Sequence, residues 1–505
     1  MELNFGKNIV SCLDTAVREI QNSEQTQEIK LPDGMPDIGR ILSAWGQPIL
    51  RGKEWRSDCV SFSGGMMVWV LYAPEDGSTE RCIDAWIPFQ MKWDLPDNTP
   101  EGEIRIQCLP RFVDARSVSA RKIMVRTGMA AMAEAFTPKA VEVFTPEGIS
   151  EEVELLRSTY PVRLSKEAGE KTFLLDEDLT LPDSAPQPEK LIYYRLNPRI
   201  TDRKVLSNKV VFRGNANLHI LYRSEEGQLH SWDFELPFSQ YAELKNEHGT
   251  DAQADIALSP TSLELELDDE GHLRFKGGIV AQYLITDKQL LELIEDAYSP
   301  NRELGIQTEN LELPVVLENR RENIYGEQTI PAEANLTADV NFFPDFPRQR
   351  RTENGVEMEM PGTFQVLYYG EDGILHSGTA RWEGQQNLNA DDSSQILAIP
   401  MPAEPQAITG NGQIMVKNDI PMEMTTVARQ SIPMVTGVEL GDQRIPDPNR
   451  PTLILRRAGE NRLWDIAKRS GSTMDAIRKA NNLQDEPAPN KMLLIPVSGL
   501  TIKHS

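Results

Sequence analysis

The side chains that most often carry enzymatic chemistry are present in this chain, but their spacing matches no catalytic or metal-binding pattern. None of the six histidines falls in an H-E-x-x-H zinc motif or beside a Ser or Cys nucleophile motif, and there is no G-x-x-x-x-G-K-[ST] phosphate loop. With 77 Asp and Glu residues, spacing alone singles out no acid–base pair. We therefore expect no active site, no metal and no cofactor, in a protein that is not an enzyme. The histidines are His219, His230, His248, His272, His376 and His504.

The four cysteines, Cys12, Cys59, Cys82 and Cys108, lack the close pairs of a zinc site and are too few for a disulfide scaffold. We expect free thiols in a reducing compartment. The first residues show no basic segment followed by an apolar run, and no stretch approaches the roughly 20 apolar residues of a membrane span. These features predict a cytoplasmic protein without a secretory signal or membrane insertion.

Charge is distributed unevenly along the 505 residues. The formal net charge of −25 makes nucleic acid and anionic membranes poor partners. Residues 452–497 hold eight basic and five acidic residues, which gives +3 there and −28 elsewhere. This excess indicates either a partner-binding surface or an ordinary solvated one.

The basic C-terminal segment carries start and stop signals for two short helices between two strands. Leu463, Ile466 and Ala467 share one helical face, Gly471 ends that helix, and Ser472 or Thr473 can cap the next one. The expected order is strand, helix, helix, strand. The strands are residues 453–455 and 492–496, and the second helix buries Met474, Ile477 and Ala480 before it ends at Asn481 and Asn482.

This order resembles the LysM family, a small βααβ binding domain. The matching residues are Gly459, Glu460, Leu463, Trp464, Ile466, Ala467, Asn482, Leu483, Pro489, Leu493, Ile495 and Pro496. The resemblance implies a shallow groove for N-acetylglucosamine glycans between the first turn and the loop before the last strand. The first turn is one residue longer than in the family, Asn490 replaces its usual Gly, and Trp464 is expected in the core. By position, the groove or partner face would use Gly459, Glu460, Asn461, Arg462, Leu463, Asn482, Leu483, Pro489 and Asn490.

The rest of the chain repeats itself with an offset of 150 residues. Leu31-Pro32-Asp33 recurs as Leu181-Pro182-Asp183, and Leu71-Tyr72 recurs as Leu221-Tyr222. A diverged third copy places Leu367-Tyr368 146 residues after the second. Self-similarity at a constant offset predicts tandem domains.

Each copy has alternating apolar residues that end at an Asp-Gly or Glu-Gly turn, which predicts half-buried β-hairpins. The predicted fold is mostly β: three tandem β-sandwich-like repeats with some helix, followed by the βααβ domain. Helices are expected at residues 9–20 and 289–297, from apolar residues every three or four positions. The predicted limits are 1–150, 151–305 and 306–440 for the repeats, 441–450 for a linker that lets the last domain move, and 451–498 for that domain.

Three β-rich repeats with a Leu-Pro-x-x-x-Pro-Asp-Ile-like start and a Val-Leu-Tyr…Glu-Asp-Gly hairpin, followed by LysM, resemble the SPOCS-domain family. The resemblance implies a scaffold in spore coat assembly in endospore-forming Firmicutes. It would lie in the mother-cell cytoplasm at the forespore surface and bind the coat morphogenetic ATPase or other coat proteins. Two alternatives stay open: a protein that binds peptidoglycan in the cell wall, and an enzyme whose site is assembled across repeats.

For the scaffold, we hypothesise that a basic partner face docks an acidic protein surface. Its residues would be Arg456, Arg457, Arg462 and Arg478. Charge reversal at Arg462 and Arg478 should then weaken partner binding.

Overall fold

The computed structural model describes residues 2–3, 5–145, 152–352, 355–388, 394–445, 451–459, 461–488 and 490–497. Strands dominate these ranges, and the helices in them are two short ones near the C-terminal end. The prediction of a mostly β protein is therefore confirmed. No helix in the described residues has the length and apolar character needed to cross a membrane.

The first strand set, β2–β7, forms two three-stranded antiparallel sheets, in the orders β2-β7-β6 and β3-β4-β5. Side chains of the β3-β4-β5 sheet such as Val60, Phe62 and Trp93 face the β2-β7-β6 sheet and form a shared core with Val125. The strands are β2 (Gly6–Lys30), β3 (Ile38–Trp55), β4 (Cys59–Pro74), β5 (Arg81–Asp94), β6 (Glu103–Ser119) and β7 (Lys122–Thr145).

The second strand set repeats this plan, with sheets β12-β13-β8 and β11-β10-β9 around a core that contains Phe212 and Phe275. Each of its strands takes the place of the strand six earlier in the chain. They are β8 (Glu154–Leu179), β9 (Pro188–Leu206), β10 (Lys209–Ser224), β11 (Leu229–Glu243), β12 (Gln253–Leu267) and β13 (Leu273–Tyr298).

The third strand set differs in detail, since β16 adds to the sheet of β15, β17 and β18, and two short strands, β19 and β20, pair with β21 beside β14. The short β1 (Glu2–Leu3) also pairs with β21. The strands are β14 (Arg302–Pro331), β15 (Ala334–Pro344), β16 (Arg348–Thr352), β17 (Gly355–Gly370), β18 (Leu375–Leu388), β19 (Ser394–Pro400), β20 (Gln406–Gly410) and β21 (Gln413–Gln443).

The predicted hairpin turns are confirmed. Gly77, Gly227 and Gly373 have φ values of 74°, 87° and 71°, each between two paired strands. Only glycine adopts this left-handed backbone without steric cost, so the turn chemistry is readable from sequence.

The two helices predicted at residues 9–20 and 289–297 are wrong, because both segments lie in long strands, β2 and β13. Leu291 and Leu293 alternate inward as in any strand, and a register shift between Ile294 and Asp296 then places Ile294 and Ala297, three residues apart, in one buried apolar cluster. A β-bulge thus produces apolar spacing that imitates a helical repeat.

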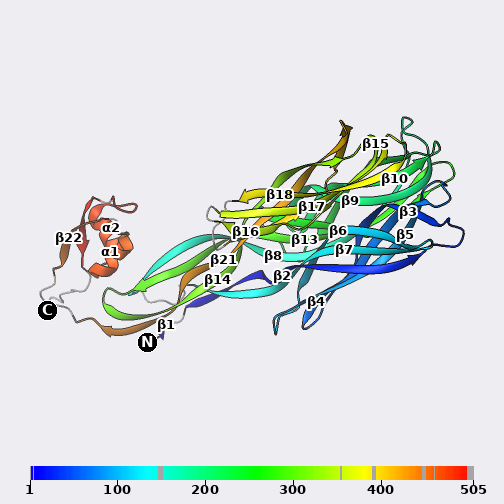
Figure 1. Ribbon diagram of the computed structural model, residues 1–505. Coiled ribbons are helices and arrows are strands. Elements are labelled where there is room, and N and C mark those ends of the chain that lie inside the picture. Colours follow the sequence, from blue (N-terminus) through cyan, green and yellow to red (C-terminus); the bar gives the residue numbers. More distant parts are fainter. Residues whose placement is uncertain are drawn as a thin grey trace, which may run out of the picture.

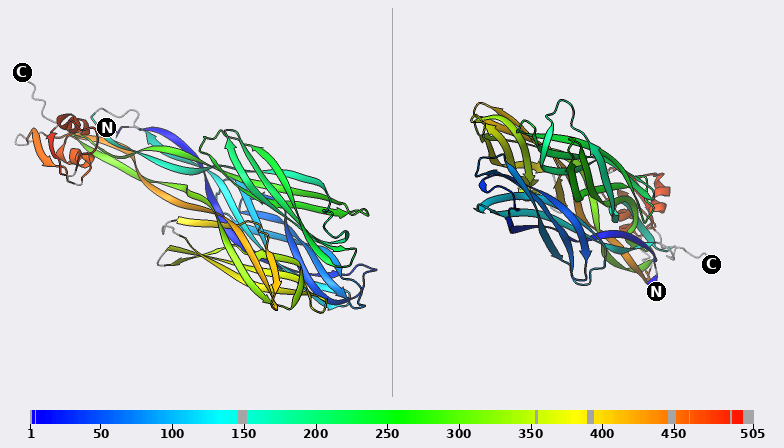
Figure 2. Two further views of the ribbon diagram at one scale, coloured as in Figure 1. Left: turned by 90° about the horizontal axis from the view of Figure 1, so that it is seen from above. Right: turned by 90° about the vertical axis from the view of Figure 1, so that its right-hand side faces the viewer.

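The three strand sets pack around a common axis. One apolar cluster combines Trp69 and Leu71 with Tyr193, Leu221 and Leu367 from the other sets. A second cluster joins the long strands of all three sets in a narrow stem that leads towards the C-terminal module (Figures 1 and 2). The sets are therefore held together by shared cores.

Contacts around this axis follow a cyclic rule. Trp69 packs edge-on against Tyr193 with ring centroids 5.2 Å apart. At the equivalent positions, 150 residues after Trp69 and 146 residues after Tyr193, His219 Nε2 lies 2.8 Å from Asp339 Oδ1. The third pair joins Gln365, 146 residues after His219, to Ser43, 150 residues before Tyr193, and Gln365 Nε2 donates to Ser43 Oγ at 3.0 Å. Each set therefore uses the same two positions to contact the next, with different chemistry.

Candidate functional site

The C-terminal module consists of β22 (Leu453–Arg457), α1 (Leu463–Ser470), α2 (Met474–Asn481) and β23 (Met492–Pro496), and β22 pairs antiparallel with β23. Helix α1 ends at Gly471 with φ 62°. Thr473 caps α2 by accepting a hydrogen bond from the Ala476 N–H at 3.1 Å. Asn482 then ends α2 in the left-handed conformation. These local signals act as predicted.

The core of the module contains Leu463, Ile466, Ala467 and Trp464, which is 2% exposed. The expectation that Trp464 belongs to the core is confirmed. The expected burial of Ala480 is wrong, because α2 has only eight residues and buries Ile477, while Ala480 lies exposed in its last turn.

The predicted groove has one described link between its two walls. The Leu463 N–H donates to Glu486 Oε2 at 2.7 Å, which ties the first turn to the loop before β23. Glu486 also takes over the capping of α1. Arg462 occupies the N-cap position, but its side chain makes no capping hydrogen bond. An acidic group near a helix N-terminus is favoured by the helix dipole. Glu486 was not singled out for this role from the sequence.

The other predicted groove residues lie around this link. Asn461, Arg462, Asn482 and Asn490 are exposed, whereas Leu463 is buried. Gly459, with φ 63°, and Leu483 are half-buried. Glu460 and Pro489 lie outside the described residues.

The module docks on the acidic end of the long ribbon formed by β8 and β13. Trp464 Nε1 donates to Asp296 Oδ2 at 2.8 Å, and Lys468 Nζ lies 2.7 Å from the same oxygen. The Tyr298 ring meets Trp464 edge-on at 4.8 Å, and its hydroxyl donates to the Ser472 carbonyl at 2.8 Å. Burial, with Glu154 and Asp296 nearby, raises the pKa of Tyr298. The module is thus held against the β8–β13 ribbon by specific contacts within its own chain.

The predicted linker at 441–450 is only partly described. Strand β21 continues to Gln443, so the first three residues of that segment are strand, and residues 446–450 lie outside the described part.

The four arginines of the predicted basic face lie on different elements. Arg462 is drawn towards the ribbon and its own helix, with guanidinium nitrogens 4.0 Å from Glu295 and 3.8 Å from Asp465. Arg456 and Arg457 are neighbours on β22, of which Arg457 is the more exposed. Arg478 is half-buried on α2, and no contact among the described residues joins it to the other three.

The outer face of the β22–β23 hairpin is apolar and open. Leu453, Leu455, Met492 and Leu494 are 52%, 63%, 48% and 39% exposed. Leu455 is paired with Leu494, and strand alternation places all four on the face opposite the buried Leu493 and Ile495. In Figure 1, β22 lies on the outer side of the module, with the helices towards the rest of the molecule. Sequence reasoning missed this face, because consecutive apolar residues indicate a strand buried on both sides.

The described cysteines are free thiols: Cys12 and Cys59 are buried, and Cys82 and Cys108 are partly buried. Burial raises the pKa of Cys108 to about 12. No group of three or more His, Cys, Asp or Glu side chains in the described ranges is arranged to hold a metal ion.

Comparison with known proteins identifies one segment. Residues 187–266 match the family model described as SipL, SPOCS domain. This segment runs from the start of β9 almost to the end of β12 and thus covers most of the second strand set. No curated protein and no solved structure matches the chain.

Proposed function

We propose that the chain is a non-catalytic scaffold of sporulation that recruits coat proteins to the forespore surface from the mother-cell cytoplasm. The SPOCS match at residues 187–266 supports the link to sporulation. The partner would be the coat morphogenetic ATPase or another coat protein. The C-terminal module, which resembles LysM, would make the contact.

The observation that carries the proposal is the open apolar face of Leu453, Leu455, Met492 and Leu494. Soluble proteins rarely leave adjacent large aliphatic side chains in water, and such patches mark protein–protein contacts. A glycan site instead needs polar groups that hydrogen-bond hydroxyls. The face therefore fits a protein partner with an apolar centre.

Basic residues at the edge of this apolar face favour a partner whose contact surface has acidic residues at its periphery. Arg457 is exposed beside Met492, and the exposed Lys491 precedes that residue. An acidic rim on the partner would meet these cations and speed association at low salt. The stem offers further surfaces on the same chain, so several modest contacts could add through effective concentration.

The test is a double substitution, Leu455→Asp with Leu494→Asp, in the tagged full-length chain in sporulating cells. Both side chains are exposed, so the module should still fold, which hydrogen exchange of α1 can verify. We expect the tagged chain to form a ring around the forespore and the variant to lose it. The control is Ile408→Asp, which changes an aliphatic residue 54% exposed on β20. An unchanged ring in the double variant would refute the role of this face.

One observation favours a second function, peptidoglycan binding. The bond from Leu463 to Glu486 joins the two walls of the predicted glycan groove. If this function holds, the full-length chain should co-sediment with purified peptidoglycan, and Asn461→Ala with Asn482→Ala should abolish this. Co-sedimentation that survives this pair but not the Leu455 and Leu494 pair would instead indicate adhesion through the apolar face.

A further inference from the structure

A cavity of about 180 Å³ lies on the common axis, between the three strand sets. One water molecule needs about 10–15 Å³ by the same measure, so the space can hold a small molecule. Pro48, Pro198 and Pro344, which occupy equivalent positions in the three sets, contribute to its largely apolar wall. An apolar cavity with a few polar groups is the usual form of a small-ligand site.

Strand β9 contributes three polar side chains to this wall, two of them arginines. Leu196 and Ile200 face the core of the second strand set. The alternate residues Arg195, Asn197 and Arg199 share the opposite face, and all three line the cavity. The equivalents of Arg195 in the other sets are Trp45 and Asn341, so the second set alone places a cation at this position.

Arg195 is buried without a full set of partners. It is 7% exposed, its Nη1 donates to Asn341 Oδ1, and its guanidinium also bonds the Tyr193 hydroxyl, but its Nε has no hydrogen-bond partner in the described chain. Asp339 and Asp233 attract the Arg195 guanidinium, but both carboxylates bond His219, at 2.8 Å. A buried guanidinium N–H left without an acceptor is costly, and a bound anion would remove that cost.

Arg199 adds a second cation to the same wall. It is partly buried, and its guanidinium forms no ion pair with any described residue. Four residues of extended strand separate it from Arg195, which is about 13 Å along β9. The two arginines therefore serve different parts of the cavity.

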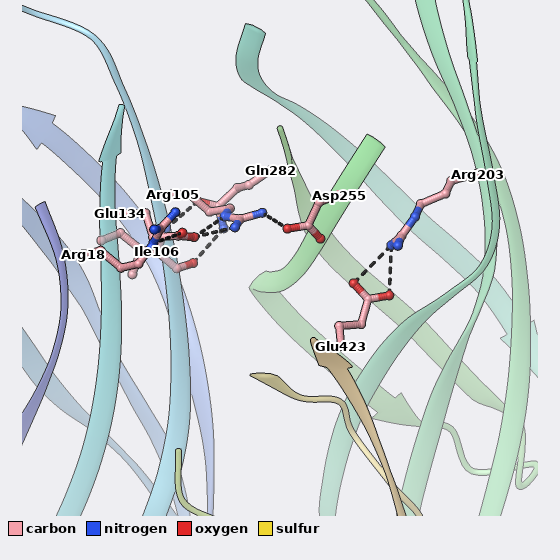
Figure 3. Close-up of polar contacts among 8 residues, drawn as sticks. All are labelled: Arg18, Arg105, Ile106, Glu134, Arg203, Asp255, Gln282 and Glu423. Atoms are coloured by element: carbon pink, nitrogen blue, oxygen red, sulfur yellow. Dashed lines mark hydrogen bonds and ion pairs between the residues drawn. The ribbon is translucent and has the colours of Figure 1, made fainter. Parts of the chain in front are cut away.

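The carboxylates that line the cavity are already neutralised. Arg105 Nη1 lies 2.6 Å from Asp255 Oδ2, and Arg203 Nη1 lies 2.9 Å from Glu423 Oε1. Figure 3 shows these two pairs together with Glu134, which binds both Arg18 and Arg105. The donors left unused on this wall are therefore the Nε of Arg195 and the guanidinium of Arg199.

We propose that the axial cavity binds a small organic carboxylate, with its carboxyl group on Arg195 Nε or Arg199 and its apolar body against the prolines. A planar carboxylate matches the donor geometry of a guanidinium. The site is independent of the proposed scaffold function, since it lies away from the C-terminal module.

The test uses 4-fluorobenzoate as the probe and ¹⁹F NMR of the full-length chain. We expect saturable line broadening by the probe, and binding at least tenfold weaker for 4-fluorobenzamide, which has the same shape without the charge. Ala257→Leu adds three carbons to a side chain of β12 that lines the cavity and should block binding. Arg199→Gln tests the less buried cation, and Arg213→Gln, an exposed arginine on the neighbouring strand β10, is its control.

Binding that is lost in Ala257→Leu and kept in Arg213→Gln supports the site. Arg199→Gln assigns the carboxyl group: weakening of about tenfold places it on Arg199, and full affinity places it on Arg195. Absence of binding to the unaltered chain, equal binding of the amide, or binding unaffected by Ala257→Leu would each overturn the proposal. Thermal unfolding of each variant checks that the chain remains folded.

Discussion

The most telling single residue in the body of the molecule is His219, which lies buried between two carboxylates of different strand sets. Burial and Arg195 act to lower the pKa of His219, but Asp339 and Asp233 outweigh them and raise it above its ordinary value. Because the folded pKa is raised, protonated His219 contributes stability that is fully present below the ordinary pKa of about 6.5 and is lost as pH rises through the folded pKa.

We predict that His219→Gln, which introduces the residue type found at the equivalent Gln365, lowers the free energy of unfolding by about 1–3 kcal/mol at pH 6. The deficit should shrink at higher pH, where the wild-type histidine also becomes neutral. Urea unfolding of both proteins between pH 5.5 and 9 measures it. The exposed His272, changed to Gln, should have almost no effect. A deficit that stays constant with pH would contradict the assigned role of the protonated ring.

At the scale of elements, the decisive contact is between α1 and the end of β13. The register shift beside Asp296 brings its carboxylate to Trp464 and Lys468. A buried indole N–H needs an acceptor, so this one carboxylate fixes where the module sits. Part of the module's positive charge, that of Lys468, is therefore paired with an acidic residue of the same chain.

Replacing that acceptor should loosen the module without unfolding the rest. We predict that Asp296→Ala weakens docking by about 1–3 kcal/mol, because the indole N–H loses its partner. Hydrogen exchange of the Trp464 indole and of α1 should become faster by about tenfold or more, while exchange in β3–β5 stays the same. Asp485→Ala, an exposed carboxylate of the same module, serves as the control. Equal exchange in both variants would show that Asp296 is not the anchor.

At the scale of the whole molecule, the three strand sets behave structurally as the subunits of a trimer joined in one chain. Two apolar clusters draw residues from all three sets, and the cyclic contacts repeat at equivalent positions. A set removed from its neighbours would expose its own residues of each cluster to water, at a cost proportional to the apolar area. The sets should therefore unfold together.

We predict one cooperative calorimetric transition for the strands β2 to β21. Leu313→Ala, in the stem cluster and 0% exposed, should shift that whole transition and lower the free energy of unfolding by about 2–5 kcal/mol. Leu317→Ala, on the same strand but 56% exposed, should change it little. A separate early transition confined to the third strand set would contradict the shared core.

Local chemistry was readable from the sequence. Glycines at the hairpin turns and the caps of α1 and α2 act within four residues of their own backbone, so residue type determines their structure. The mostly β character was readable for the same reason, since alternation is a local pattern. The segments of β2 and β13 that were predicted as helices show where local patterns fail. Which side chains of a strand face inward depends on bulges against a partner strand more than a hundred residues away.

Tertiary structure alone decided how the surfaces are used. Trp464 and Asp296 are 168 residues apart, and neither residue type indicates the other. The same holds for the axial cavity, where Arg195 acquires its environment from strands of all three sets, and for the open face of the β22–β23 hairpin. Sequence determines what a residue can do through its own backbone and neighbours, whereas burial, pairing and exposure depend on which distant segments pack against it.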